Sequence, residues 1–77
     1  MDYHYHRLRD LREDHDMTQQ QIAEYLKIGR IQYFRYESGQ REIPVHLLIR
    51  LACLYKTSVD YLLDLTNNPR PPKDIPE

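Results

Sequence analysis

Residues 17–39 read MTQQQIAEYLKIGRIQYFRYESG, and this stretch decides the fold. Thr18 followed three residues later by Gln21 is a capping box: the Thr18 hydroxyl accepts from the third helical amide, and the Gln21 side chain bonds back to the Thr18 amide. Met17 and Ile22 occupy the hydrophobic-staple positions, which fix how the chain enters the helix. A helix therefore starts after Thr18. Its predicted buried residues are Ile22, Ala23 and Leu26.

The helical periodicity breaks at residues 27–29 and resumes in a second helix from about Arg30 to Glu37. Tyr33 and Tyr36, three residues apart, are its predicted inward face. Gly39 suits the left-handed end of that helix. Two helices joined by a three-residue turn form the helix-turn-helix arrangement.

The flanking sequence adds three more helices and no strand. Residues 5–14 form a short amphipathic helix around Leu8 and Leu11. Pro44 fits the first turn of a longer helix. The apolar stripe of this longer helix is Leu47, Leu48, Leu51, Ala52 and Tyr55.

Ser58 caps a last short helix that contains Val59, Leu62 and Leu63. Four prolines follow in the final twelve residues, with little to bury. We therefore predict an all-α fold, a compact five-helix bundle over residues 1–65, with a Pro-rich extended or disordered tail over residues 66–77.

Composition excludes several classes of protein. The 77 residues contain one cysteine, Cys53, so no intramolecular disulfide can form, and we expect it to pack in or beside the fourth helix as a small apolar residue. No apolar run suggests a signal peptide or a membrane span, so we place the protein in the cytoplasm. His4, His6 and His15 lack the partners of a metal site. We expect no metal, no cofactor and no enzymatic activity.

The charge is nearly balanced overall, with 11 basic and 12 acidic residues. Residues 27–41 nevertheless carry four basic side chains against Glu37 alone, a balance of +3, whereas residues 1–16 have a balance of −2. A local basic segment of this kind can bind nucleic acid with modest non-specific affinity.

Several blocks at matching spacing carry a resemblance to a known family. LRDLREDHDMTQQQIAEYLKIGRIQYFRYESGQREIP, residues 8–44, and LIRLACLYKTSVDYLL, residues 48–63, resemble the Cro-and-phage-repressor helix-turn-helix proteins, or XRE family. The resemblance implies a lambda-repressor-like fold and a bacterial or phage DNA-binding domain, usually of a transcriptional repressor. Its second helix would rest on the DNA backbone and its third would enter the major groove.

The resemblance assigns roles to exposed side chains. Arg30, Ile31 and Arg35 would read bases, since Arg can bind guanine with two hydrogen bonds and Ile can pack on a thymine methyl. Gln32 would read adenine or point sideways toward a phosphate. The residues expected to contact or position the phosphate backbone are Thr18, Gln19, Phe34, Ser38, Gly39, Gln40 and Arg41. The alternative is that these are ordinary solvated residues of a polar surface.

Three positions carry further expectations. Arg12 and Glu37 match positions that form an ion pair in many family members. Lys27 stands where relatives commonly have glycine, at a cost of about 1 kcal/mol if it takes the left-handed conformation. Phe34, where relatives usually have a small polar residue, is either an exposed contact to DNA or a protein partner, or half-buried.

We expect a homodimer on double-stranded DNA, with an inverted-repeat operator whose half-sites lie ~34 Å apart. The segment Tyr61–Leu65 and the tail are the expected dimer surfaces. The alternative function is a protein-interaction module, antitoxin-like or bound to an anti-repressor. The chain could also be the DNA-binding head of a longer regulator.

Overall fold

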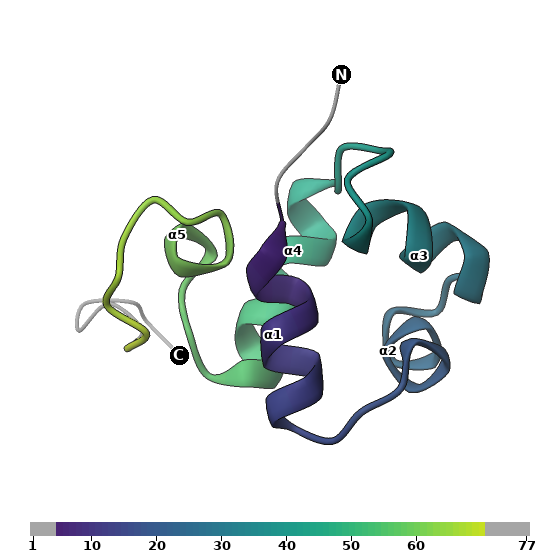
Figure 1. The fold of residues 1–77 in the computed structure, drawn as a ribbon, viewed down its shortest axis with the longest axis horizontal. Coiled ribbons are helices and arrows are strands. Elements are labelled where there is room, and N and C mark those ends of the chain that lie inside the picture. Colours follow the sequence, from purple (N-terminus) through teal and green to yellow (C-terminus); the bar gives the residue numbers. More distant parts are fainter. Residues whose placement is uncertain (1–4, 71–77) are drawn as a thin grey trace.

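A computed structural model describes residues 5–70 as five helices (Figure 1), and no strand occurs among these residues. The helices are α1 (His6–Asp14), α2 (Gln19–Leu26), α3 (Arg30–Glu37), α4 (Val45–Tyr55) and α5 (Val59–Leu62). The predicted all-α fold and the order of its elements are confirmed. Residues 1–4 and 71–77, which include His4 and most of the predicted tail, lie outside the described part of the chain.

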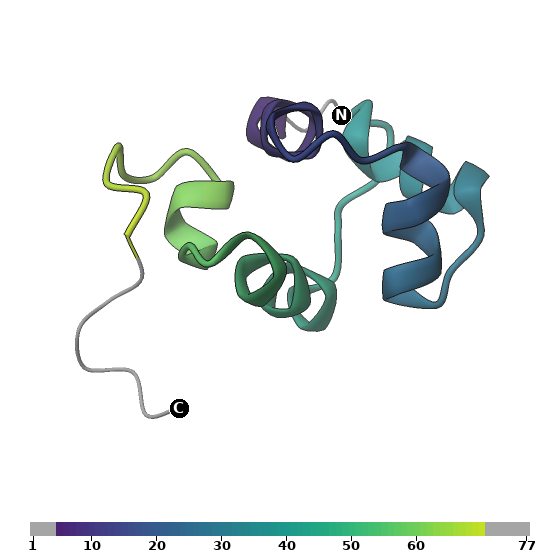
Figure 2. The ribbon, with the colours of Figure 1, turned by 90° about the horizontal axis from the view of Figure 1, so that it is seen from below.

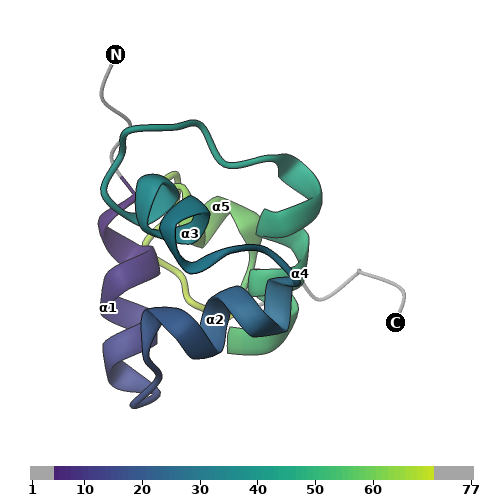
Figure 3. The ribbon, with the colours of Figure 1, turned by 90° about the vertical axis from the view of Figure 1, so that its right-hand side faces the viewer.

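The helices enclose one core. Helices α1 and α4 face each other across it, α2 and α3 close one end, and α5 closes the other (Figure 2). Seen onto the α2–α3 end, α1 and α4 lie on opposite sides of the molecule (Figure 3). The helix-turn-helix pair therefore forms one face of its own.

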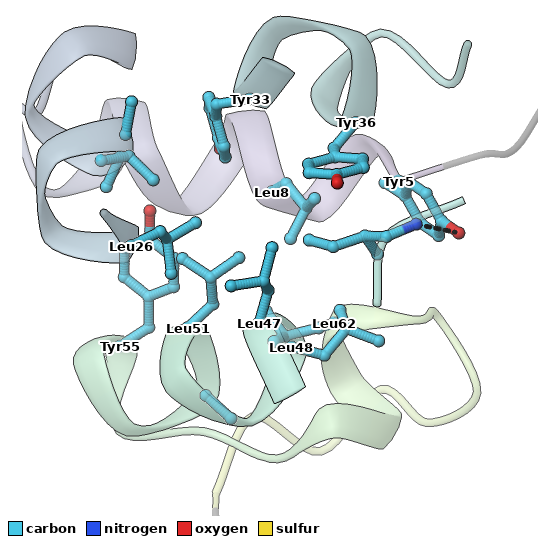
Figure 4. Close-up of a cluster of buried hydrophobic side chains, with 14 residues drawn as sticks. Tyr5, Leu8, Leu26, Tyr33, Tyr36, Leu47, Leu48, Leu51, Tyr55 and Leu62 are labelled. Carbon is cyan, nitrogen blue, oxygen red and sulfur yellow. Dashed lines mark hydrogen bonds between the residues drawn. The ribbon is translucent and has the colours of Figure 1, made fainter. Parts of the chain in front are cut away.

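All five helices contribute buried apolar side chains to this core (Figure 4). The predicted apolar core face of α4 is confirmed, since its five residues are all buried. Leu8 of α1 and Leu62 of α5 are almost inaccessible, and Tyr33 and Tyr36 turn inward from α3 as predicted. Each fully buried aliphatic side chain of this size contributes roughly 1.5–3 kcal/mol. At the edge of the core, the Tyr5 hydroxyl accepts a hydrogen bond from the Ile43 amide at 3.3 Å.

The helix starts follow their local signals, with one exception. Thr18 Oγ1 accepts from the Gln21 amide at 3.1 Å, and Gln21 Oε1 accepts from the Thr18 amide at 2.8 Å, which confirms the capping box. Ser58 Oγ accepts from the Tyr61 amide at 3.0 Å. The prediction for Pro44 was wrong by one residue. Its ψ of 147° is extended, so Pro44 is the N-cap and α4 begins at Val45.

Two left-handed residues end the helices of the motif. Lys27 has φ 60° and ψ 43°, so the glycine-like conformation expected at this turn is present without a glycine. Gly39, after α3, has φ 83°, as predicted. Gly29 is the N-cap of α3 and supplies no side-chain cap.

Arg7 of α1 binds α5 and the segment that follows it. It donates to the carbonyl oxygens of Tyr61 and Thr66 and to Asn67 Oδ1, and pairs with Asp64 at 3.0 Å. Its guanidinium also lies 3.9 Å from the centre of the Tyr61 ring. Residues just after α5 are therefore held to α1 by hydrogen bonds.

Arg50 ties α4 to the end of α2. Its guanidinium donates to the carbonyl oxygens of Tyr25 at 2.6 Å and Leu26 at 3.3 Å, where a helix C-terminus favours a positive charge. The Tyr25 hydroxyl donates in return to the Arg50 carbonyl oxygen. No local pattern in the sequence indicates that Arg7 and Arg50 connect helices.

The prediction that Cys53 packs in or beside the fourth helix as a small apolar residue was wrong, because its side chain is exposed. It lies on α4 at helical spacing from Val45 and Ile49, away from the buried stripe. Within residues 5–70, no helix is long and apolar enough to cross a membrane, and no group of His, Cys, Asp and Glu is arranged to hold a metal ion.

Replacing Lys27 tests whether its left-handed backbone conformation is strained. Lys27→Gly should raise the free energy of unfolding by about 1 kcal/mol, because glycine adopts this conformation without a Cβ clash. The matched control is Glu24→Gly, on the exposed helical part of α2, which should lower it by about 1 kcal/mol. Urea unfolding measures both. A destabilising effect of Lys27→Gly would contradict the backbone conformation described.

Candidate nucleic-acid interface

The outward face of α3 is a row of exposed side chains. Tyr33 and Tyr36 are buried, so the helical period turns Ile31 and Arg35, four residues apart, away from the core. The exposed residues of α3 are Arg30, Ile31, Gln32, Phe34 and Arg35. They combine hydrogen-bond donors with apolar contact groups, which are the two kinds of group that read base edges.

On one flank, Arg30 lines a shallow hollow together with Thr18, Gln19 and Gln20 at the start of α2. Helix geometry leaves the Gln19 and Gln20 amides without partners inside α2, which favours an anion there. Glu13 and Asp16 line the same hollow and oppose that preference. This flank therefore offers hydrogen-bond donors rather than a strong positive field.

On the other flank, Gln32, Arg35, Tyr36 and Arg41 line a second hollow, which has two arginines and no acidic residue. Gln32 Nε2 donates to the Tyr36 hydroxyl at 3.1 Å, so the amide is turned sideways along the helix surface. Tyr36 was predicted only as a core residue. A buried ring whose hydroxyl reaches a surface side chain cannot be told from an ordinary core tyrosine by sequence spacing.

Phe34 is 42% exposed, which favours the exposed alternative over burial. It lines a hollow between α1, α2 and α3. The other residues of this hollow are Arg9, Arg12, Gln19, Glu37 and Ser38. Phe34 is thus the apolar side chain of an otherwise polar hollow.

The backbone amides of the loop after α3 already donate hydrogen bonds to carbonyl oxygens of α3. Ser38 donates to the Phe34 carbonyl oxygen, Gly39 to that of Tyr36, and both Gln40 and Arg41 to that of Arg35. Gly39 is buried and forms the left-handed turn. What the loop can offer a ligand is therefore its exposed side chains. These belong to Ser38, Gln40 and Arg41.

The Arg12–Glu37 ion pair is present and joins α1 to α3. Arg12 Nε and Nη2 donate to the two carboxylate oxygens of Glu37 at 2.9 and 3.0 Å, while Nη1 donates to the Met17 carbonyl oxygen at 2.9 Å. Gln19 Nε2 adds a hydrogen bond to Glu37 at 3.3 Å. The side chains of Arg12 and Glu37 are only 14% and 5% exposed. A buried carboxylate therefore links α1, α2 and α3.

This network sets the protonation of its members. Burial acts to raise the pKa of Glu37, but the hydrogen bonds from Arg12 and Gln19, with the Arg12 charge, outweigh it and lower that pKa below the ordinary 4.5. Burial raises the pKa of Tyr33 and Tyr55, and the Glu37 charge adds to the effect. Glu37 is therefore an anion that stabilises the native state at neutral pH.

The chain is similar in sequence and in fold to known proteins. A family model described as helix-turn-helix matches residues 8–62. The chain is 45% identical over 65 residues to the HTH-type transcriptional regulator YobD of Bacillus subtilis, covering 84% of this chain and 58% of that protein. It is 39% identical over 57 residues to the HTH-type transcriptional regulator ImmR of the same organism, covering 74% and 45%.

A solved structure agrees with the sequence relatives. The crystal structure of a transcriptional regulator from Listeria innocua superposes with a TM-score of 0.76 at 28% sequence identity, over 88% of this chain and 64% of that one. The chain spans about half the length of the Bacillus relatives.

The buried carboxylate predicts a specific pH dependence. Since the pKa of Glu37 is lower in the folded state, its stabilisation is present above about pH 4.5 and is lost as the pH falls through the folded pKa. Glu37→Gln should lower the free energy of unfolding by about 3 kcal/mol at pH 7, because it leaves Arg12 without its counterion. The difference in the free energy of unfolding between Glu37→Gln and the unmodified protein should become smaller below pH 4.5.

The matched control is Glu13→Gln, which removes the same charge from an exposed pair with Arg9. It should change the free energy of unfolding by less than ~1 kcal/mol at pH 7. Denaturant unfolding from pH 3 to pH 8 measures both variants. Equal effects of the two substitutions would contradict a structural role for Glu37.

Proposed function

This chain belongs to the helix-turn-helix family of transcriptional regulators, and from that premise we propose that it binds double-stranded DNA sequence-specifically as a repressor, with α3 in the major groove. The observation that carries the proposal is the division of α3 into two faces. Tyr33, Tyr36 and Glu37 anchor it, while Ile31 and Arg35 turn away from the core. Members of this family are regulators rather than enzymes, in agreement with the expectation of no catalytic activity.

Arg30, Ile31 and Arg35 are the proposed base-reading residues. Arg35 would form two hydrogen bonds to a guanine, and Ile31, its neighbour one helical turn away, would pack on a thymine methyl. Arg30, at the start of α3, would reach a base at the edge of the site. A bidentate contact of this kind is worth about 1–3 kcal/mol of discrimination against the wrong base.

The phosphate contacts would come from both flanks of α3. Gln32 and Arg41 share the hollow that holds two arginines and no acid, and this favours a phosphate there over the hollow at the start of α2. The hydrogen bond from Gln32 to Tyr36 supports a sideways, phosphate-facing role for Gln32. The remaining proposed backbone contacts are Thr18, Gln19, Phe34, Ser38 and Gln40.

The DNA partner would be an inverted repeat bound by a homodimer. A two-fold arrangement of two α3 helices requires half-sites about one helical turn apart, ~34 Å. Because the chain has a net charge of −1 and its basic side chains near α3 are limited to Lys27, Arg30, Arg35 and Arg41, non-specific binding should be weak. Specific contacts would then supply most of the affinity at physiological salt.

One observation favours a second candidate function. Ile31 and Phe34 are both exposed apolar side chains on α3, and such residues also suit a protein partner. In that case the chain would act as a protein-interaction module through the same helix. The two candidate functions differ in one respect. A DNA-reading protein binds some duplex sequence selectively, whereas a protein-interaction module binds none selectively.

Selection from random duplex DNA tests the proposal directly. The unmodified chain should enrich an inverted repeat and bind it at least about a thousandfold more tightly than scrambled DNA. No enrichment, with only weak binding that ignores sequence, would contradict the DNA-reading function and favour the interaction module.

Two arginine variants then separate base reading from phosphate contact. Arg35→Ala should lose preference at one base pair of each half-site, with a cost of about 1–3 kcal/mol for the preferred duplex only. Arg41→Ala should weaken binding to all duplexes similarly and reduce the salt dependence by about one phosphate contact. Binding of the enriched and the base-substituted duplexes across a salt series measures both. Identical specificity for Arg35→Ala and the unmodified chain would refute the assignment of Arg35.

A further inference from the structure

The outward side of α4 carries an apolar stripe that no described part of the chain covers. Val45 is 66% exposed, Ile49 is 51% exposed, and Cys53 is exposed as well. These three residues are spaced by four along α4, so they lie on one side of the helix. The buried residues of α4 face the core instead. We name Val45, Ile49 and Cys53 the α4 stripe.

We propose that the α4 stripe is the contact surface for a second copy of this chain, packed antiparallel to α4 about a two-fold axis at Ile49. Val45 and Cys53 each lie four residues from Ile49, on opposite sides. A two-fold operation at Ile49 therefore brings Ile49 against its own copy, and Val45 against Cys53 of the other chain. The stripe is thus complementary to itself, as a two-fold interface requires.

The charges at the two ends of the stripe fit the same pairing. Glu42 precedes α4 and Lys56 is its C-cap, each seven residues from Ile49, and both are exposed. Antiparallel packing places the end of α4 preceded by Glu42 beside the end that carries Lys56 of the other copy, so the charges at the two adjoining ends are opposite. Arg50, the charged residue next to Ile49, is held by the carbonyl oxygens of Tyr25 and Leu26. Its charge is thus directed away from the stripe.

The position of α4 keeps the candidate DNA interface open. Seen onto the α2–α3 face, α4 lies at one side of the molecule (Figure 3). A copy packed against that side, related by a two-fold axis along this line of sight, presents its own α2–α3 face in the same direction. The pairing therefore leaves both α3 helices accessible from one side, as binding to an inverted repeat needs.

The competing surface is Leu65, just after α5, which is 72% exposed and lies in the segment predicted from the sequence as a dimer surface. Its neighbour Tyr61 is covered by the Arg7 guanidinium, and the Thr57 hydroxyl holds the Pro69 carbonyl oxygen nearby. Leu65 is thus a single exposed apolar side chain, whereas α4 presents three in a row. A stripe this short buries less than the ~800 Å² per partner of a stable interface, so the pairing is weak.

Site-directed cysteine crosslinking tests both the surface and its register. In the unmodified chain, the two Cys53 residues would lie about 12 Å apart along the paired helices, too far for a disulfide. Ile49→Cys combined with Cys53→Ala places one thiol on each side of the two-fold axis and should give a disulfide-linked dimer under mild oxidation. Val45→Cys with Cys53 retained should also crosslink. Val45→Cys with Cys53→Ala should not.

Leu65→Cys combined with Cys53→Ala is the matched control and should remain a monomer under the same oxidation. Crosslinking of this control, with none at Ile49, would overturn the proposal in favour of the α5 surface. Equal crosslinking of all variants would also overturn it, because it would indicate random collision. Circular dichroism of each reduced variant checks that the fold is retained.

A charge exchange gives a second test that needs no new thiol. Glu42→Lys should raise the dimer Kd measured by sedimentation equilibrium several-fold, and adding Lys56→Glu to the same chain should restore it. Failure of the second substitution to rescue the first would refute the antiparallel register. The role given to this dimer rests on the proposed two-fold binding to DNA. Neither test of the dimer uses DNA. Either proposal can therefore fail without the other.

Discussion

The carboxylate of Glu37 is the point at which the first three helices are held together. It receives two hydrogen bonds from Arg12 of α1 and one from Gln19 of α2, and it belongs to α3. Removing an ion pair of this kind from water costs several kcal/mol, which only good geometry and full hydrogen bonding offset. The geometry here is bidentate, which fixes both distance and angle between α1 and α3. The direction in which α3 presents its outer face depends on this pair.

Such a constraint matters because α3 is short. A helix of eight residues is not stable alone in water, so its orientation must come from tertiary contacts. The rings of Tyr33 and Tyr36 anchor its inward face in the core, and Glu37 fixes its last turn. The outward side chains are then displayed by a rigid support, although none of them contributes to the core. This is how a small domain can hold a short helix with an exposed outer face on its surface.

Local signals account for what could be predicted from the sequence. The Thr18–Gln21 capping box, Gly39 and the buried leucines of α4 each act within a few residues, so they give the element order and most of the core. Pro44 was misplaced by one residue because both positions tolerate its fixed φ. The Arg12–Glu37 pair was expected only from the family resemblance. Arg7 and Arg50 act on residues 54 and 25 positions away, and no local pattern indicates such partners.

A nuclear magnetic resonance titration tests most directly whether the outer face of α3 binds DNA. Isotope-labelled protein would be titrated with the selected duplex while its backbone amide signals are followed. We expect the largest shifts at Arg30, Ile31 and Arg35, with smaller shifts at the start of α2 and in the loop to Arg41. Shifts confined to α1 and α5, with the α3 signals unchanged on binding, would contradict it.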